Sequence, residues 1–291
     1  MRSYDAYRAM ITEALPRVFD GKPALPERLK EAMEYSLLAG GKRLRPVLLL
    51  AACDLKGGDP EKALPFACAL EMIHTYSLIH DDLPAMDNDD LRRGRPTNHK
   101  VYGAGVATLA GDGLLNAAME LMLSEAVRTR DEGALLAAEA IARRAGITGM
   151  IAGQTEDVIL EGTEPEEEKV LFIHEHKTAD LLTAPLEAGL RLAGASEEEV
   201  QSGIRYGYHF GLAFQMVDDL LDVVGDAALM GKNTGMDAQR GKMTQVACVG
   251  VDQTRKIAAA HIEKACEAMR PFGPDAAFFT DLARATLNRV S

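Results

Sequence analysis

Cysteine is scarce in this chain, and the few that occur are scattered. Among 291 residues there are four, Cys53, Cys68, Cys248 and Cys266, and no two of them form a C-x-x-C pair. This spacing indicates neither a zinc knuckle nor a disulfide framework. We therefore expect four reduced thiols in the core.

Positive charge and long apolar runs are also in short supply. Lysine and arginine number 32 against 44 aspartates and glutamates, a net charge of -12. Such a chain repels nucleic acid and anionic membranes, so an anionic ligand needs a local basic site or a metal. Residues 1–16 contain Asp5, Arg8 and Glu13 where a signal peptide is unbroken and apolar. No later run approaches the roughly 20 apolar residues of a membrane span. We expect a cytoplasmic protein without a membrane span or a nucleic-acid partner.

Alternation with period two, the mark of a half-buried strand, is not sustained anywhere. Apolar residues instead recur three and four positions apart, in segments rich in Ala, Leu, Met and Glu. With 47% hydrophobic residues and no break long enough for a linker, the pattern predicts one all-α domain over residues 1–291, with roughly ten helices.

Two helix starts have the S/T-x-x-E pattern of a capping box. Thr163 with Glu166 predicts a helix beginning near Glu164, and Ser196 with Glu199 predicts one beginning near Glu197.

An aspartate cluster at residues 218–222 lies in a segment that is apolar on nearly all sides. Asp218 and Asp222 are four residues apart and share one helix face. Two like charges in a mostly buried helix are unfavourable without a cation, so metal binding is favoured over a solvated acidic face.

A second aspartate cluster, at residues 81–87, ends an apolar helix. On an unbroken helix Asp81 and Asp87 would point to different sides. Pro84 disfavours helical geometry at Leu83 and should bend the chain, so that Asp87 folds back toward Asp81. By itself an aspartate-rich helix end is more often a surface feature, but the two clusters together predict magnesium ions that bridge to a polyphosphate.

Two basic runs supply positive partners for such an anion. They span residues 40–46, Gly-Gly-Lys-Arg-Leu-Arg-Pro, and residues 91–97, Leu-Arg-Arg-Gly-Arg-Pro-Thr. Arginine offers planar, bidentate donors that match phosphate, although either run alone is more often a solvated patch.

These motifs, taken in order, resemble the trans-type short-chain prenyl diphosphate synthases, and in particular the bacterial-type farnesyl diphosphate synthases. The resemblance covers nearly the whole chain. Its motifs are the run at 40–46, residues 74–80 leading into the aspartates at 81–87, Gly153-Gln154, Lys177-Thr178, Phe214-Gln215, the aspartates at 218–222, Gly231-Lys232 and Lys242. The sequence departs from the family at Asp180, where a small residue is common, and at residues 243–246, where the family often continues with Thr-Tyr-Pro after Lys242.

The resemblance implies an all-α bundle of the isoprenoid synthase type with a central cavity. It implies head-to-tail condensation of isopentenyl diphosphate with dimethylallyl or geranyl diphosphate, release of diphosphate, and a homodimer. The clamp for isopentenyl diphosphate is then Lys42, Arg45, His74 and Arg93. Three magnesium ions are implied, two on Asp81 and Asp87 and one on Asp218, with Asp82 and Asp222 assisting. Arg92, Lys177 and Lys232 complete charge neutralisation, and Thr178 and Gln215 face the allylic end, so Arg92, Lys177, Thr178 and Gln215 are the catalytic candidates.

Tyr76 is the candidate floor of the substrate cavity. It precedes Asp81 by five residues, which is about 7.5 Å along a helix. In the family resembled here, an aromatic at this offset accompanies a fifteen-carbon product, which predicts farnesyl diphosphate; the alternatives are geranylgeranyl or geranyl diphosphate, or an ordinary core tyrosine.

Two other functions compete with that of a prenyl diphosphate synthase. A terpene cyclase does not need the clamp of Lys42, Arg45 and His74. A non-catalytic partner subunit should have lost one aspartate cluster, whereas both are intact.

His174 and His176 are two residues apart on a helix and are poor metal partners for each other.

Overall fold

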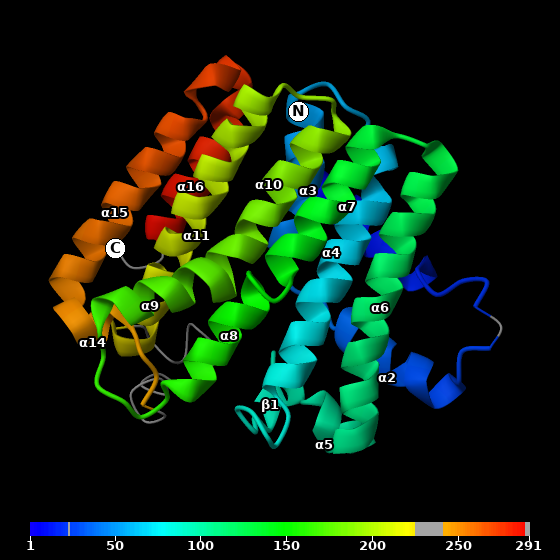
Figure 1. Cartoon of the computed structure of the whole chain (residues 1–291), viewed down its shortest axis with the longest axis horizontal. Helices are drawn as coiled ribbons and strands as arrows, with labels where there is room; N and C mark the ends of the chain where they lie inside the picture. Colours follow the sequence, from blue (N-terminus) through cyan, green and yellow to red (C-terminus); the bar gives the residue numbers. More distant parts are fainter. Residues whose placement is uncertain (23, 225–240, 289–291) are drawn as a thin grey trace. The chain divides into compact units, whose positions relative to one another are not determined.

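A computed structural model describes residues 1–22, 24–224 and 241–288 of the chain (Figure 1). Its regular structure is nearly all helical, with a single two-stranded sheet among the described residues. The all-α prediction is confirmed. All four cysteines are free, and Cys53, Cys68 and Cys266 are buried.

The contacts divide the chain into two compact units. The N-terminal unit comprises Arg2–Glu139 with Arg191–Gly194, and the C-terminal unit comprises Ala140–Leu190 with Ala195–Ser291. The single domain over residues 1–291 stays a prediction.

The N-terminal unit is built around helix α4, Pro60–Asp81, which packs against α3 and α6 (Figure 1). Asp59 caps this helix by accepting a hydrogen bond from the Glu61 amide, and Pro60 occupies its first turn, where no amide partner is needed. The other elements are α1 (Tyr4–Ala14), η1 (Leu15–Arg17), α2 (Glu27–Leu37), α3 (Leu44–Leu55), β1 (Leu91–Arg92), β2 (Arg95–Pro96), α5 (Asn98–Tyr102), α6 (Ala104–Thr129) and most of α7 (Glu132–Ala145). Burial of α4 on all sides fixes the position of the first aspartate motif at its end.

The C-terminal unit is built around helix α11, Glu197–Val224, which lies side by side with α15 (Figure 1). The π-helix η2, His174–Ala179, also packs against α11. The other elements are α8 (Met150–Ile159), α9 (Glu167–Ile173), α10 (Asp180–Leu192), α14 (Gln245–Val249), α15 (Val251–Ala268), η3 (Arg270–Ala276) and α16 (Ala277–Leu287). The second aspartate motif lies near the C-terminal end of α11.

The two predicted capping boxes have different outcomes. Ser196 and Glu199 form one: the Ser196 amide donates to the Glu199 carboxylate at 2.9 Å, and the Glu199 amide donates to Ser196 Oγ at 3.4 Å. The other prediction is wrong, because α9 begins at Glu167 and the Thr163 hydroxyl donates to the Leu160 carbonyl. Pro165 is the physical reason, since the residue before a proline is disfavoured in helical geometry.

Among the described residues, helix α6 is the one helix that passes a length and composition test for a membrane span. By length and composition alone it is long and apolar enough to cross a membrane, which the sequence prediction did not foresee. One third of its most apolar window is buried, and Leu109, Leu123 and Val127 are exposed by 59%, 53% and 76%. Packing against α4 explains the buried part, and the exposed leucines and valine form an apolar face that the described residues leave uncovered.

Candidate active site

The first aspartate motif, in the N-terminal unit, folds back as the sequence predicts. After α4 ends at Asp81, the Asp87 amide donates to the Asp81 carbonyl at 2.8 Å. The Met86 and Asn88 amides both donate to the Leu83 carbonyl, which closes the turn around Pro84. The bend thus brings the backbones of Asp81 and Asp87 together.

Burial separates the aspartates of this motif by role. Asp81 and Asp87 are partly exposed, whereas Asp82 is 3% exposed and accepts hydrogen bonds from Arg92, from Nε at 2.8 Å and from Nη2 at 2.6 Å. Burial raises the pKa of Asp82 above its ordinary value, although Arg92 opposes that rise. Asp82 therefore holds Arg92, and Asp81 and Asp87 are the more accessible carboxylates of the motif.

A short hairpin presents three arginines near this motif in the N-terminal unit. Strand β1 pairs with β2 in the register Arg92 opposite Arg95, and Arg93 and Gly94 between them have φ of 54° and 72°. Positive φ at both central residues is typical of the type I′ hairpin turn. Arg92, Arg93 and Arg95 line one pocket together with Tyr35, Thr75 and Asp82. The predicted basic run is thus a rigid turn that lines a pocket.

Arg45 and His74 of the predicted clamp lie close together. Arg45 Nη1 is 3.4 Å from His74 Nε2. Burial and the charges of Arg45 and Arg93 hold the pKa of His74 well below its usual range, so the ring is neutral and accepts from the arginine. Burial lowers the pKa of Arg45 to about 10. Arg45 Nε is buried without a hydrogen-bond partner among the described residues, a donor suited to an anion.

The remaining clamp residues lie at the surface. Lys42 is exposed, and its carbonyl accepts from the Tyr4 hydroxyl at 2.7 Å. Arg93 is exposed and donates to the Gly40 carbonyl. Between Lys42 and Arg45, Arg43 has a different role: it is 6% exposed and donates to Glu71 Oε1 at 2.6 Å. The sequence showed both arginines in one run but did not show which of them is structural.

Tyr76 is buried on α4, as expected for either a cavity floor or a core residue. Its exposed fraction is 6%, and its ring meets the His80 ring edge to face at 5.7 Å. His80 Nε2 in turn lies 3.0 Å from the Thr108 carbonyl of α6. Burial and the charge of Asp81 raise the pKa of Tyr76 to about 12, so the phenol is neutral. Its role in chain length stays a prediction.

The second aspartate motif, in the C-terminal unit, shows the same division by burial. Asp218 is partly exposed, while Asp219 and Asp222 are 2% and 4% exposed. Asp219 accepts from the Gln215 amide group at 3.0 Å and from the Gln245 backbone amide at 2.8 Å. His174 Nε2 is 3.3 Å from the same carboxylate. Asp219 thus organises α11, η2 and α14, and Asp218 remains the more accessible ligand candidate.

The π-helix η2 carries the predicted catalytic pair Lys177 and Thr178. The Thr178 hydroxyl donates to Gln215 Oε1 at 2.9 Å, so these two predicted residues are brought together. Lys177 Nζ donates to Asp157 Oδ2 at 2.6 Å, and Lys242 Nζ donates to the same oxygen at 3.0 Å. Burial would raise the pKa of Asp157, but the two lysines lower it below its ordinary value. Lys232, also predicted, lies outside the described residues.

Asp157 is the functional residue that the sequence reasoning missed. A helical signal was available, because Met150, Gly153 and Asp157 follow one another at spacings of three and four and are all buried on α8. A side chain at Gly153 could not fit, since its Cβ would lie 2.1 Å from the Lys177 backbone nitrogen. Gly153 therefore lets η2 approach α8 closely enough for Lys177 to reach Asp157.

The donor set fits magnesium. Mg²⁺ takes one or two carboxylates and fills its shell with water and substrate phosphates. The partly exposed Asp81, Asp87 and Asp218 offer such hard oxygens. The described residues contain no group of three or more His, Cys, Asp or Glu side chains that could form an all-protein metal site. A magnesium ion here would therefore depend on ligands from substrate and water.

The all-α fold and the carboxylates and arginines of the two motifs are typical of an enzyme that acts on phosphate-bearing substrates. Comparison with known proteins identifies the family. The model of the family described as Polyprenyl synthetase matches residues 26–271, so the chain belongs to that family. It is 46% identical to farnesyl diphosphate synthase of Geobacillus stearothermophilus over 253 residues, 87% of this chain and 85% of that protein. It is also 46% identical to chloroplastic geranylgeranyl pyrophosphate synthase 9 of Arabidopsis thaliana over 256 residues, 87% of this chain and 71% of the relative.

Solved structures agree with this assignment. A geranyltransferase from Legionella pneumophila is 33% identical with a TM-score of 0.86, and the match covers 98% of this chain and 96% of that one. An FPP/GFPP synthase from Zymomonas mobilis is 35% identical with a TM-score of 0.86, over 97% and 98% of the two chains. The protein is thus a prenyltransferase, as the sequence predicted, and the relatives differ in the product that their names state.

Proposed function

We propose that this prenyltransferase condenses isopentenyl diphosphate with an allylic diphosphate, head to tail, and releases diphosphate. The observation that carries the proposal lies in the N-terminal unit, where the turn brings the backbones of Asp81 and Asp87 together, both residues are partly exposed, and three arginines line a pocket with the neighbouring Asp82. Carboxylates suited to magnesium beside arginines suited to phosphate match a magnesium diphosphate, and neither group alone does.

The clamp residues bind the second diphosphate without metal in this proposal. Arg45 brings a buried Nε donor that has no hydrogen-bond partner in the described part of the chain, and His74 is kept neutral, so it orients Arg45 without adding charge. Lys42 and Arg93, which are exposed, close on the anion from the surface. Arginine is suited to this task because its planar fork matches phosphate oxygens.

Asp81, Asp87 and Asp218 would hold three magnesium ions, which supply neutralisation of the charge that develops on the departing diphosphate. Lys177 and Arg92 add fixed positive charge, and each is oriented by a buried carboxylate, Asp157 or Asp82. Because the Thr178 hydroxyl donates a hydrogen bond to Gln215, the lone pairs of its oxygen can stabilise the allylic cation. The condensed chain then loses a proton, and the departing diphosphate accepts it.

For the product, we infer farnesyl diphosphate from Tyr76. A buried, neutral ring one helical turn below Asp81 limits the length of a growing chain. Geranylgeranyl diphosphate is the second candidate, and the names of the plant relatives favour it.

We further propose that the chain is a cytoplasmic homodimer. The apolar face of α6 supports this, because Leu109, Leu123 and Val127 are exposed and a second copy of α6 could cover them. A heterodimer is the alternative assembly, because a 46% identical relative is named as the large subunit of a heterodimeric geranylgeranyl pyrophosphate synthase. Light scattering of the purified chain and fractionation of cells that express it test assembly and location.

Turnover by the purified chain tests the function. The protein is incubated with labelled isopentenyl diphosphate and dimethylallyl diphosphate, with magnesium or with chelator, and the dephosphorylated products are separated by chromatography. A magnesium-dependent fifteen-carbon alcohol supports the proposal, and a twenty-carbon product keeps the chemistry but discards the role of Tyr76. A hydrocarbon indicates a cyclase, and the absence of any product indicates a partner subunit.

A further inference from the structure

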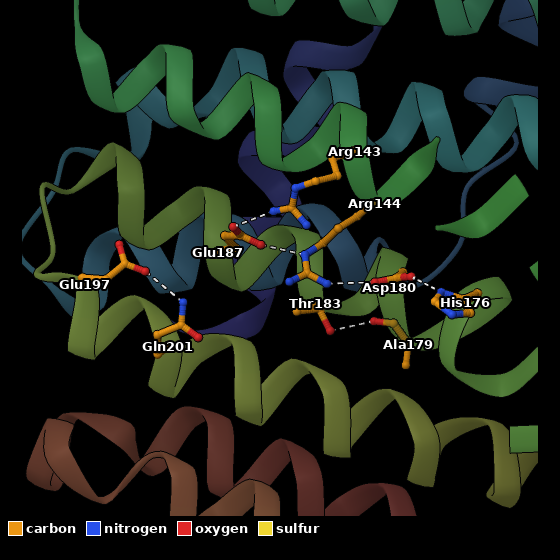
Figure 2. Close-up of polar contacts among 9 residues, drawn as sticks. All are labelled: Arg143, Arg144, His176, Ala179, Asp180, Thr183, Glu187, Glu197 and Gln201. Carbon is orange, nitrogen blue, oxygen red and sulfur yellow. Dashed lines mark hydrogen bonds and ion pairs between the residues drawn. The ribbon is translucent and has the colours of Figure 1, made fainter. Parts of the chain in front are cut away.

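A chain of five charged or titratable side chains runs beside η2 in the C-terminal unit (Figure 2). Arg143 Nη2 donates to Glu187 Oε1 at 2.9 Å, and Arg144 Nε donates to Glu187 Oε2 at 2.7 Å. Arg144 Nη1 donates to Asp180 Oδ1 at 2.8 Å, and His176 Nδ1 lies 2.8 Å from Asp180 Oδ2. Arg144 thus binds the carboxylates of both Asp180 and Glu187, and Asp180 also contacts His176 within η2.

This network is largely shielded from water. The side chains of Arg144, Asp180 and Glu187 are 12%, 15% and 6% exposed. His176 is further held by the Phe172 ring, whose centroid is 4.4 Å from its own. Shielded, hydrogen-bonded ion pairs fix geometry more strongly than exposed pairs, which contribute little.

The network reaches η2, the segment that carries the predicted catalytic residues Lys177 and Thr178. A π-helix is rare, and the π-turns that interrupt α-helices are frequently found at functional sites. In η2 its wide turn carries Lys177 and Thr178 directly after His176 and ends where Asp180 begins α10. Helix α8 confines η2 at Gly153, and α11 confines it at Gly211, whose Cβ would lie 2.5 Å from the Ala179 Cα. The ion network ties η2 to the end of α7.

We propose that Arg144, Asp180 and His176 are positioning residues, which hold η2 in the π-helical form that presents Lys177 and Thr178. The proposal rests on the function given above, in which those two residues act on the allylic substrate. It also accounts for Asp180, which stands where a small residue is common in the family. In this chain the carboxylate at 180 joins Arg144 to His176, and neither link can form with a small apolar residue there.

The test compares Asp180→Ala and Arg144→Gln with two controls. Glu187→Gln removes the negative charge from the same network at the end away from His176, and Glu197→Ala removes the exposed contact in which Gln201 donates to Glu197. Asp180→Asn serves as the milder variant if Asp180→Ala does not fold. Steady-state kinetics are measured with both substrates at a temperature at which every variant is folded, together with hydrogen exchange of peptides that cover residues 174–179.

We expect kcat to fall by about tenfold or more in Asp180→Ala and Arg144→Gln, because a misplacement of about 1 Å can cost on the order of 100-fold. The KM for isopentenyl diphosphate should stay unchanged, since its clamp lies in the N-terminal unit. Exchange in residues 174–179 should rise in these two variants, while Glu187→Gln should lose stability with kcat near that of the unaltered protein.

Either of two results for Asp180→Ala overturns the inference: a kcat equal to that of the unaltered protein, or an exchange of residues 174–179 equal to that of the unaltered protein. A loss of kcat in Glu187→Gln as large as in Asp180→Ala also overturns it, since Arg144, Asp180 and His176 would then have no role that the rest of the network lacks. If the unaltered protein makes no prenyl product, the proposed function fails, and the exchange measurement still decides whether the network holds η2.

Discussion

Replacing Asp157 by asparagine should destabilise the protein more than a typical surface change does. Its carboxylate is 6% exposed and accepts from two ammonium groups, those of Lys177 at 2.6 Å and Lys242 at 3.0 Å. The substitution keeps the shape but leaves two lysines that repel each other around a neutral amide. Removal of one partner from a buried ion pair costs about 3–5 kcal/mol.

The expected cost at Asp157 is below that range. The Lys177 side chain is 28% exposed, and solvent screens its charge in part. We therefore expect the free energy of unfolding to fall by about 2–3 kcal/mol. For a chain of this size that corresponds to a melting temperature lower by roughly 3–5 °C.

The pH dependence gives this prediction a second check. The two lysines lower the pKa of Asp157 in the folded protein below its unfolded value. The stabilisation is therefore complete above about pH 4, and it is lost as the pH falls through the folded pKa. The difference in melting temperature between the unaltered protein and Asp157→Asn should be full at pH 7 and shrink below about pH 4.

Calorimetry of Asp157→Asn and of Asp275→Asn, an exposed aspartate in η3, supplies the comparison. The control should melt within about 1 °C of the unaltered protein, as surface substitutions usually do. If Asp157→Asn melts with the control, the two lysines do not depend on this carboxylate. An activity loss in Asp157→Asn at a temperature where it is folded would show in addition that Lys177 needs its partner for turnover.

Three further predictions concern other parts of the molecule. Tyr76→Ala should lengthen the products, because it removes a buried ring one turn below Asp81; chromatography that shows an unchanged chain length would refute the floor role. Asp87→Asn should lower kcat by at least about tenfold and raise the magnesium concentration needed for half-maximal activity. Asp90→Asn, at an exposed residue paired with Lys100, should change neither. Equal dependence of activity on magnesium in the two variants would contradict this. His261, whose Nδ1 lies 3.0 Å from that of His209, has its pKa lowered to about 4 by burial, then by His209 and Lys264. The unfolded chain therefore takes up the proton first as the pH falls from about 6.5, and stability is lost between about pH 6.5 and 4. The free energy of unfolding should fall less between pH 7 and pH 5 in His261→Gln than in the unaltered protein, by about 1 kcal/mol after allowance for partial exposure. Urea unfolding at both pH values measures this, and an equal fall in the two proteins would refute it.

The sequence by itself determined the features that depend on a few neighbouring residues. Pro84 sets the turn that returns Asp87 to Asp81, and the capping box of Ser196 and Glu199 starts α11, because each acts within one helical turn. Where local signals competed, the sequence reasoning was wrong: Pro165 delayed the start of α9 despite the box at Thr163. The all-α fold followed from helical periodicity along the whole chain.

Only the tertiary structure decided which charged residues are structural and which remain accessible. Arg43 and Arg45 look alike in one run, but packing buries Arg43 on Glu71, 28 residues away. Asp157 meets Lys177 and Lys242 across separations of 20 and 85 residues, and no local pattern records such a meeting. The cost of burying an unpaired charge selects these partners, and it acts only after helices distant in sequence have packed together.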